Sequence, residues 1–111
     1  MSTHNKTFSG KDTHISEELN NGIKMLGDAW ILCVIGTLAK KEMRFNEMQR
    51  SIVGINPATL TDRLKKLENE KMVKRQEETV DKLSVVYSLT KKGQGILPIL
   101  KEIQVFADKF L

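Results

Sequence analysis

The chain has 111 residues, of which 40% are hydrophobic and 29% are charged, and this indicates one globular domain and argues against a largely disordered chain. The net charge of +4 at pH 7 favours a polyanionic partner, although many basic proteins bind no nucleic acid. The single cysteine excludes an intramolecular disulfide, the start of the chain lacks an apolar signal-peptide core, and the longest apolar run, residues 30–39, is too short to span a membrane. These features predict a cytoplasmic protein.

Residues 1–14 are polar and without periodicity, which predicts a flexible tail in front of a single domain at residues 15–111. A first helix is expected at residues 16–26 and ends at Gly27. Its apolar residues recur at helical spacing: Ile15, Leu19, Ile23 and Leu26.

The next segment predicts the helix around which the core is built. Asp28 opens it, and its apolar residues surround the helix nearly completely. They are Trp30, Ile31, Leu32, Cys33, Val34, Ile35 and Leu38. Because Cys33 lies inside this run, we expect its side chain to be buried and unreactive.

Two helices, expected at residues 46–52 and 56–70, follow the pattern of a helix-turn-helix, because a short turn containing Gly54 joins them. Gly54 can take the positive φ that such a tight turn often requires. Asn56 is a good N-cap for the second helix, and Pro57 fits the first helical position. One face of this second helix, the recognition helix, should be buried; it consists of Leu60, Leu64 and Leu67.

After the recognition helix the apolar period changes from helical to two-residue, which predicts strands at residues 72–77 and 83–89 with a hairpin tip at 78–82. The second strand should have one buried face, formed by Leu83, Val85, Tyr87 and Leu89. A helix-turn-helix followed directly by a β-hairpin is a winged helix. The expected fold class is therefore α+β, mostly α, with extra helices at both ends.

Thr90 caps the last helix, and Pro98 should kink or break it. This helix carries an apolar stripe that a monomer of this size would leave exposed, and such a surface invites a partner subunit. The stripe consists of Ile96, Ile99, Leu100, Ile103, Phe106, Ala107 and Phe110.

Four motifs carry a resemblance to a known family. They are GDAWILCVIGTL at 27–38, RFNEMQRSIVGI at 44–55, LTDRLKKLE at 60–68 and YSLTKKG at 87–93. The chain resembles the HxlR-type winged-helix transcriptional regulators, which are relatives of the MarR type. The resemblance implies a homodimer, held by the first and last helices, that puts two recognition helices into successive major grooves. The dimerisation residues it implies are Leu19, Ile23, Ile99, Ile103, Phe106 and Phe110.

Three positions depart from the pattern of this family. Many members have a sensing cysteine just before the first helix, where this chain has Glu17 or its neighbour, so a thiol sensor of that kind is not expected. Ser84 stands near the place of the wing arginine, which makes Lys82 the nearest basic substitute for a minor-groove contact. Ala29 replaces a lysine that commonly precedes the tryptophan, and this change has no functional interpretation.

The amino-terminal part of the recognition helix should supply the base contacts, as it does in helix-turn-helix proteins. The candidates are Asn56, Thr59, Asp62 and Arg63. Arg63 is expected to pair bidentately with a guanine or a phosphate. Asp62 has three interpretations: it accepts from a cytosine amine, it orients Arg63, or it is a solvated acid. Phosphate contacts, with plain surface cations as the alternative, are expected from Lys65, Lys66, Lys74, Lys82 and Arg44.

The sequence shows no cluster of nucleophile, base and orienting group and no Gly-rich phosphate loop, and His4 and His14 lack partners at metal-ligand spacing. We therefore expect no enzyme, no cofactor and no metal site. The expected function is a sequence-specific DNA-binding transcriptional regulator, a repressor that acts as a homodimer on a pseudo-palindromic operator. The alternative is a winged-helix protein-protein interaction module, against which the basic recognition face argues. A small-molecule effector of unknown identity is left open as a further partner.

Overall fold

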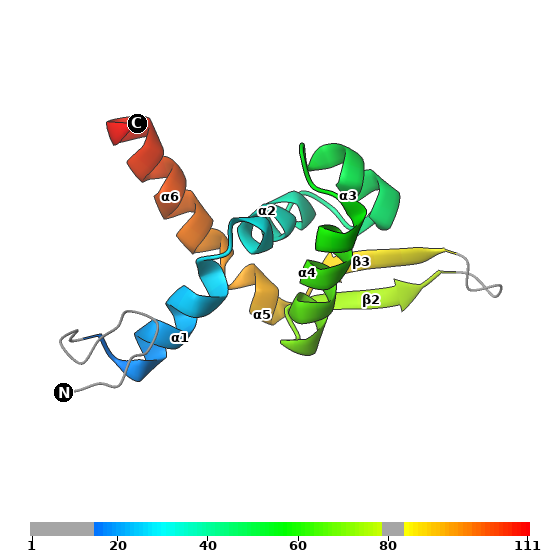
Figure 1. Cartoon of the computed structure of the whole chain (residues 1–111), viewed down its shortest axis with the longest axis horizontal. Coiled ribbons are helices and arrows are strands. Elements are labelled where there is room, and N and C mark those ends of the chain that lie inside the picture. Colours follow the sequence, from blue (N-terminus) through cyan, green and yellow to red (C-terminus); the bar gives the residue numbers. More distant parts are fainter. Residues whose placement is uncertain (1–14, 79–83) are drawn as a thin grey trace.

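The computed structural model describes residues 15–78 and 84–111 and shows a winged helix with an additional helix at each end (Figure 1). The helices are α1 (Glu17–Leu26), α2 (Ala29–Leu38), α3 (Phe45–Ser51), α4 (Pro57–Asn69), α5 (Lys91–Gln94) and α6 (Leu97–Phe110). The strands are β1 (Met43–Arg44), β2 (Val73–Glu77) and β3 (Val85–Leu89). The α+β fold class, mostly α, that the sequence predicts is confirmed. The predicted tail and hairpin tip fall mainly on residues 1–14 and 79–83, which lie outside the described residues.

Local capping residues decide where the main helices begin. Ser16, Asp28 and Asn56 precede α1, α2 and α4, and each accepts a hydrogen bond from a backbone N–H of the first turn. Replacing such a cap with alanine typically costs about 1 kcal/mol of stability, so these boundaries are encoded in a few residues. Pro57 occupies the first turn of α4, as predicted. Gly54, in the turn between α3 and α4, has a φ of 88° and thus takes the predicted left-handed conformation.

The sheet has three antiparallel strands in the order β1-β3-β2. Strand β1 is not predicted from the sequence, because two residues carry no recognisable period. Met43 and Arg44 pair with Tyr87 and Val86 of β3, so β3 is the central strand.

The predicted burial of β3 is wrong in one respect. Val86, expected on the exposed face, is buried, whereas Val85, Tyr87 and Leu89 are only half-buried. The reason is the extra strand β1. Directly paired residues project to the same face of a sheet, so the residues of β1 and β2 that pair with Val86 flank its side chain on both sides.

The core lies between α2, α4 and the sheet. Leu60, Leu64 and Leu67 of α4 are buried as predicted and pack in one cluster with Ile31 and Ile35 of α2. Full burial of each such side chain favours folding by about 1.5 to 3 kcal/mol, which fixes α4 to α2.

The expected burial of Cys33 is wrong, because this cysteine is exposed. Ile31, Val34, Ile35 and Leu38 supply the buried face of α2. Cys33 is two residues beyond Ile31, so it lies about 200° around the helix on the opposite side. It lines a surface depression of about 390 Å³ together with Lys40, Met43 and other residues of α2 and the turn after α3.

Pro98 breaks the last predicted helix into α5 and α6, as expected, and lies in the first turn of α6. In Figure 1, α6 extends away from the winged helix, and none of its residues is buried. Among the described residues, no single helix is long and apolar enough to cross a membrane; α1 and α2 reach that length and composition only as a pair bent by 75°.

Candidate nucleic-acid interface

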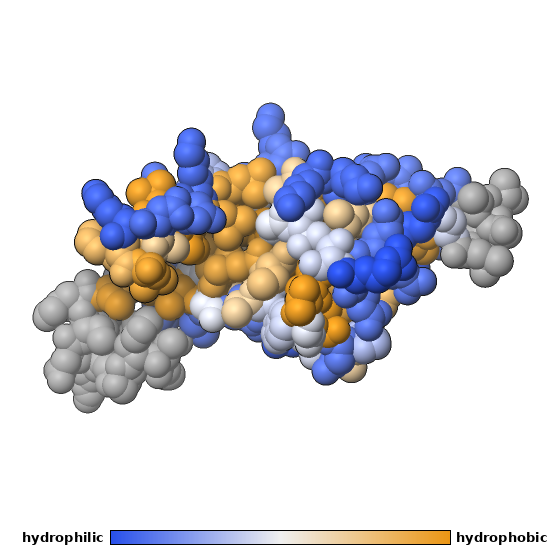
Figure 2. All heavy atoms as spheres, turned by 90° about the horizontal axis from the view of Figure 1, so that it is seen from above, coloured by the Kyte–Doolittle hydropathy of each residue, from blue (hydrophilic) through white to orange (hydrophobic). Residues whose placement is uncertain are grey.

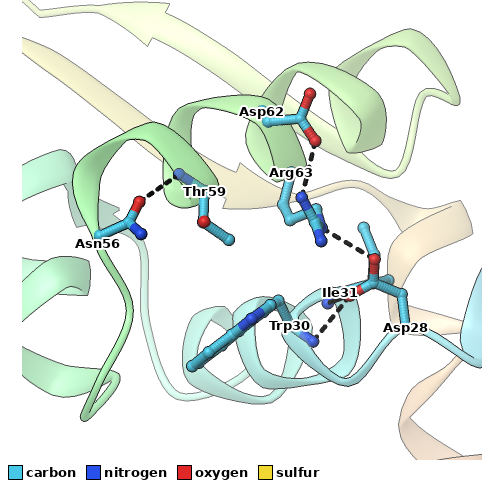
Figure 3. A network of polar contacts seen from close by, with 7 residues as sticks. All are labelled: Asp28, Trp30, Ile31, Asn56, Thr59, Asp62 and Arg63. Carbon is cyan, nitrogen blue, oxygen red and sulfur yellow. Dashed lines mark hydrogen bonds and ion pairs between the residues drawn. The ribbon is translucent and has the colours of Figure 1, made fainter.

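Helix α4 and its N-cap carry six of the nine residues predicted to contact DNA. Those that are exposed are Asn56, Asp62, Lys65 and Lys66, whereas Thr59 and Arg63 are half-buried. The Asn56 Oδ1 accepts from the Thr59 backbone N–H at 2.8 Å (Figure 3). This oxygen is therefore used as the helix cap, and the amide nitrogen is the group that Asn56 can offer to a base.

Arg63 points from α4 toward the start of α2 and lies between two carboxylates (Figure 3). Its Nε donates to Asp28 Oδ2 at 2.9 Å, and its Nη1 donates to Asp62 Oδ2 at 2.8 Å. The Arg63 side chain is 25% exposed. The sequence left three interpretations of Asp62 open. The structure shows the ion pair with Arg63 that one of them, the orientation of Arg63 by Asp62, requires.

Asp28 was missed as a partner of the recognition helix. Its Oδ1 accepts from the backbone N–H groups of Trp30 and Ile31 at 2.9 and 3.3 Å, which caps α2. Its Oδ2 is the oxygen that binds Arg63. The cap is visible in the sequence, but the second bond joins residues 35 positions apart, and no local pattern predicts it.

Arg44, in β1, is bonded to the residue that follows β2 and to the residue that precedes β3. Its Nε donates to Ser84 Oγ at 3.0 Å, its Nη2 pairs with Glu78 Oε1, and Ser84 Oγ donates to the same Glu78 oxygen at 2.8 Å. The hydrogen bond from Ser84, and then that from Arg44, lowers the pKa of the Glu78 carboxyl below its ordinary value of 4.5. A phosphate contact by Arg44 would therefore compete with Glu78.

The other predicted cations lie at different places. Lys74 is exposed on β2, opposite Ser88 of β3. Lys82, His4 and His14 lie outside the described residues. The residues of 15–78 and 84–111 contain no group of three or more His, Cys, Asp or Glu side chains that could hold a metal ion.

The end of α4 is held by the YSLTKKG motif. Thr90 Oγ1 donates to the Lys71 carbonyl at 2.6 Å, and Lys92 Nζ donates to the Glu70 carbonyl at 2.7 Å. The Thr90 backbone N–H also donates to the Met72 carbonyl. These bonds connect the C-cap of the recognition helix and the two residues after it to the segment that leads into α6.

One end of the molecule carries an apolar surface, which we call the α6 surface. Figure 2 shows hydrophobic residues gathered over the end that carries α1 and α6, while the surface toward the wing is mostly hydrophilic. The α6 surface comprises the exposed side chains of Ile99, Ile103, Phe106 and Phe110, and Leu19 of α1 is also exposed. Phe106 and Phe110 are 56% and 68% exposed, and Ile23 of α1 is half-buried. Nothing in the described part of the chain covers these two phenyl rings completely. An exposed apolar surface of this kind usually marks an interface.

The family described as HxlR-like helix-turn-helix matches residues 25–111. The HTH-type transcriptional regulator YodB of Bacillus subtilis is 32% identical over 93 residues, which cover 84% of this chain and 83% of YodB. An HTH-type transcriptional regulator of Halalkalibacterium halodurans is 39% identical over 98 residues, which cover 86% of this chain and 87% of that relative.

Solved structures show the same architecture. The reduced form of YodB superposes with a TM-score of 0.77 at 31% identity and covers 86% of this chain and 94% of its own. A protein described as a MarR-family transcriptional regulator from Porphyromonas gingivalis gives a TM-score of 0.80 at 30% identity, covering 89% of this chain and all of its own. The resemblance found in the four sequence motifs is therefore confirmed.

Proposed function

The chain belongs to the HxlR-like helix-turn-helix family, and from this premise we propose that it is a sequence-specific repressor that binds double-stranded DNA as a homodimer. Transcriptional regulation is the function of its relatives by name. The proposal adds the DNA-binding residues, the dimer and the mode of action.

The observation that carries the proposal is the placement of α4. Its leucine face is buried in the core, so the helix is presented rigidly, and its opposite face is polar with Lys65 and Lys66 exposed. The amino-terminal residues of such a helix contact base edges in the major groove, while lysines contact phosphates. An exposed, basic and rigidly held helix fits DNA better than it fits the apolar groove of a protein partner.

The dimer is proposed from the α6 surface. If two chains bury their α6 surfaces around a two-fold axis, the two α4 helices are related by the same axis. They would then meet half-sites about 34 to 36 Å apart, or a multiple of that distance, and the operator would be an imperfect palindrome. Residues 15–111 would form the single domain that performs both tasks.

Repression requires only that the bound dimer occlude a promoter, so no catalytic residue or cofactor is part of the proposal. We propose a cytoplasmic location because the proposed target is DNA. YodB has been solved in a quinone-bound form, and we keep an effector of unknown identity as a further partner of this chain.

The test is a DNA shift assay with the region upstream of the chain's own gene, at raised salt and with excess competitor DNA. A specific complex should form with the wild-type protein. Lys66→Ala should weaken binding to all sequences and lower the salt slope by about one, because one phosphate contact is lost. Lys101→Ala, which changes the same charge on α6, is the matched control. A complex that competitor DNA removes completely would contradict the proposal and favour a protein-interaction module.

A further inference from the structure

We propose that Asp62 is a specificity-determining residue that selects a cytosine in each half-site, and that Arg63 and Asp28 are positioning residues that hold it. This inference rests on the proposed DNA-binding function. It reverses the sequence-based expectation for Arg63, which was a direct contact to guanine or phosphate.

Asp62 and Arg63 differ in accessibility. The Asp62 side chain is 67% exposed on the outer face of α4, whereas that of Arg63 is 25% exposed. Asp62 lies about 200° around the helix from the buried Leu60, and Arg63 lies about 300° around, beside the buried face. Asp62 is therefore the residue of the two that faces a groove into which α4 is inserted.

The Asp62 carboxylate is held in a fixed direction by Arg63. Its Oδ2 accepts from Arg63 Nη1 at 2.8 Å, and Arg63 Nε is bound to Asp28 Oδ2 at 2.9 Å (Figure 3). The other oxygen of Asp28 is bound to the first turn of the core helix α2. The chain of contacts from Asp62 through Arg63 thus ends on the rigid core. Such preorganisation reduces the conformational entropy that a polar contact would otherwise lose on binding.

A lone carboxylate near DNA is repelled by phosphate. Because Arg63 offsets one of the two carboxylates it contacts, the three side chains together keep a single negative charge, and the repulsion is weaker than for two free carboxylates. The same pairing leaves Arg63 with little net charge to offer to DNA.

The chemistry of the base edges decides which base a carboxylate can bind. A carboxylate only accepts hydrogen bonds, and in the major groove the donors are the amines of cytosine and adenine. The adenine amine lies beside the N7 acceptor, which repels a carboxylate, so cytosine is the favoured partner. The polar ligand that fits this site is therefore the cytosine N4 amine.

The experiment selects binding sites for the full chain from duplexes with a randomised core. The variants are Asp62→Asn, Asp28→Asn and, as a matched control, Glu68→Gln. Asparagine is as good an N-cap as aspartate, so Asp28→Asn keeps the start of α2 and removes only the charged partner of Arg63. Glu68→Gln removes the same charge from an exposed position of α4 outside this chain of contacts. Thermal unfolding of each variant shows that the fold is retained.

The wild type should enrich a cytosine at one symmetric position of each half-site. Asp62→Asn should lose that preference by about fivefold or more and shift the same position toward adenine, which asparagine pairs bidentately. Asp28→Asn should weaken the preference at that position alone, and Glu68→Gln should leave it unchanged. An unchanged cytosine with Asp62→Asn would overturn the specificity role, and a loss spread over all positions with Asp28→Asn would overturn the positioning role. Failure of the wild type to enrich any sequence would instead contradict the proposed function itself.

Discussion

Gly93 lies so close to Met72 that a Cβ atom at position 93 would be 2.2 Å from the Met72 carbonyl oxygen. Gly93 is in α5, and Met72 lies between the end of α4 and the start of β2. The glycine is thus required by close approach of two backbones and not by an unusual φ. Together with the bonds from Thr90 and Lys92, this contact holds the end of the recognition helix against the segment leading to α6.

Gly93→Ala should lower the free energy of unfolding by about 2 kcal/mol or more, because the atom it would overlap belongs to the backbone and cannot rotate away. The matched control is Gly22→Ala in α1, where an added Cβ meets nothing within 4 Å. That change should be neutral or should stabilise by about 0.5 to 1 kcal/mol, since alanine is the better helix former. Urea unfolding followed by circular dichroism measures both. Equal effects of the two substitutions would contradict the close contact at Gly93.

Glu78 should make stability depend on pH in the acid range. Its carboxyl has a folded-state pKa below the ordinary value of 4.5, because Ser84 and Arg44 donate to it. A lowered pKa means that the contribution to stability is fully present above about pH 4.5 and is lost as the pH falls through the folded-state pKa. Urea unfolding from pH 7 to pH 3 should therefore show a difference between wild type and Glu78→Gln that becomes smaller as the pH falls. A difference that stays constant over this range would show that the carboxylate charge plays no part.

Cys33 should react with a thiol reagent in the folded protein. Its exposed position on α2 predicts one thiol labelled under native conditions by a disulfide reagent, at a rate near that of the unfolded chain. Cys33→Ser provides the blank, because Cys33 is the single cysteine of the sequence. Slow labelling that accelerates only when the chain unfolds would show that Cys33 is buried, as the apolar run suggested.

Phe106→Glu combined with Phe110→Glu should dissociate the proposed dimer without unfolding the chain. Both rings are more than half exposed in the single chain, so their loss removes little from the monomer core. Charge placed in a buried interface carries a desolvation cost that opposes association. Sedimentation at micromolar concentration and circular dichroism should report a folded monomer, and footprinting should show weakened protection of both half-sites. Lys101→Glu, an exposed change on the same helix, is the control. A wild-type protein that sediments as a monomer and protects one asymmetric half-site with full affinity would contradict the dimer.

The helices could be predicted well because their signals are local. Ser16, Asp28, Asn56 and Thr90 lie at N-caps, and a cap needs only the residues of one turn. The break at Pro98 could be predicted for the same reason, because a proline disturbs only the neighbouring helical turn.

The errors concern features that no short stretch of the sequence reveals. The burial of Val86 depends on β1, a strand of two residues that becomes regular only by pairing with β3. Cys33 was assigned to the core because composition does not distinguish the two sides of an apolar helix when both carry hydrophobic residues. The partner of Arg63 could not be predicted because Asp28 is 35 positions away and has a sufficient local role as a cap.

The pairing of β1 with β3 has a consequence for how the molecule can adapt to its target. Arg44 is both a residue of β1 and the N-cap of α3, so no hinge separates the wing sheet from the helix-turn-helix. The described wing strands, α3 and α4 should therefore move as one rigid body. If the proposed dimer meets an operator of imperfect shape, the adjustment must come from bending of the duplex or from rotation of one subunit against the other. Sequence-dependent stiffness of base pairs that the protein never touches would then contribute to selection of the site.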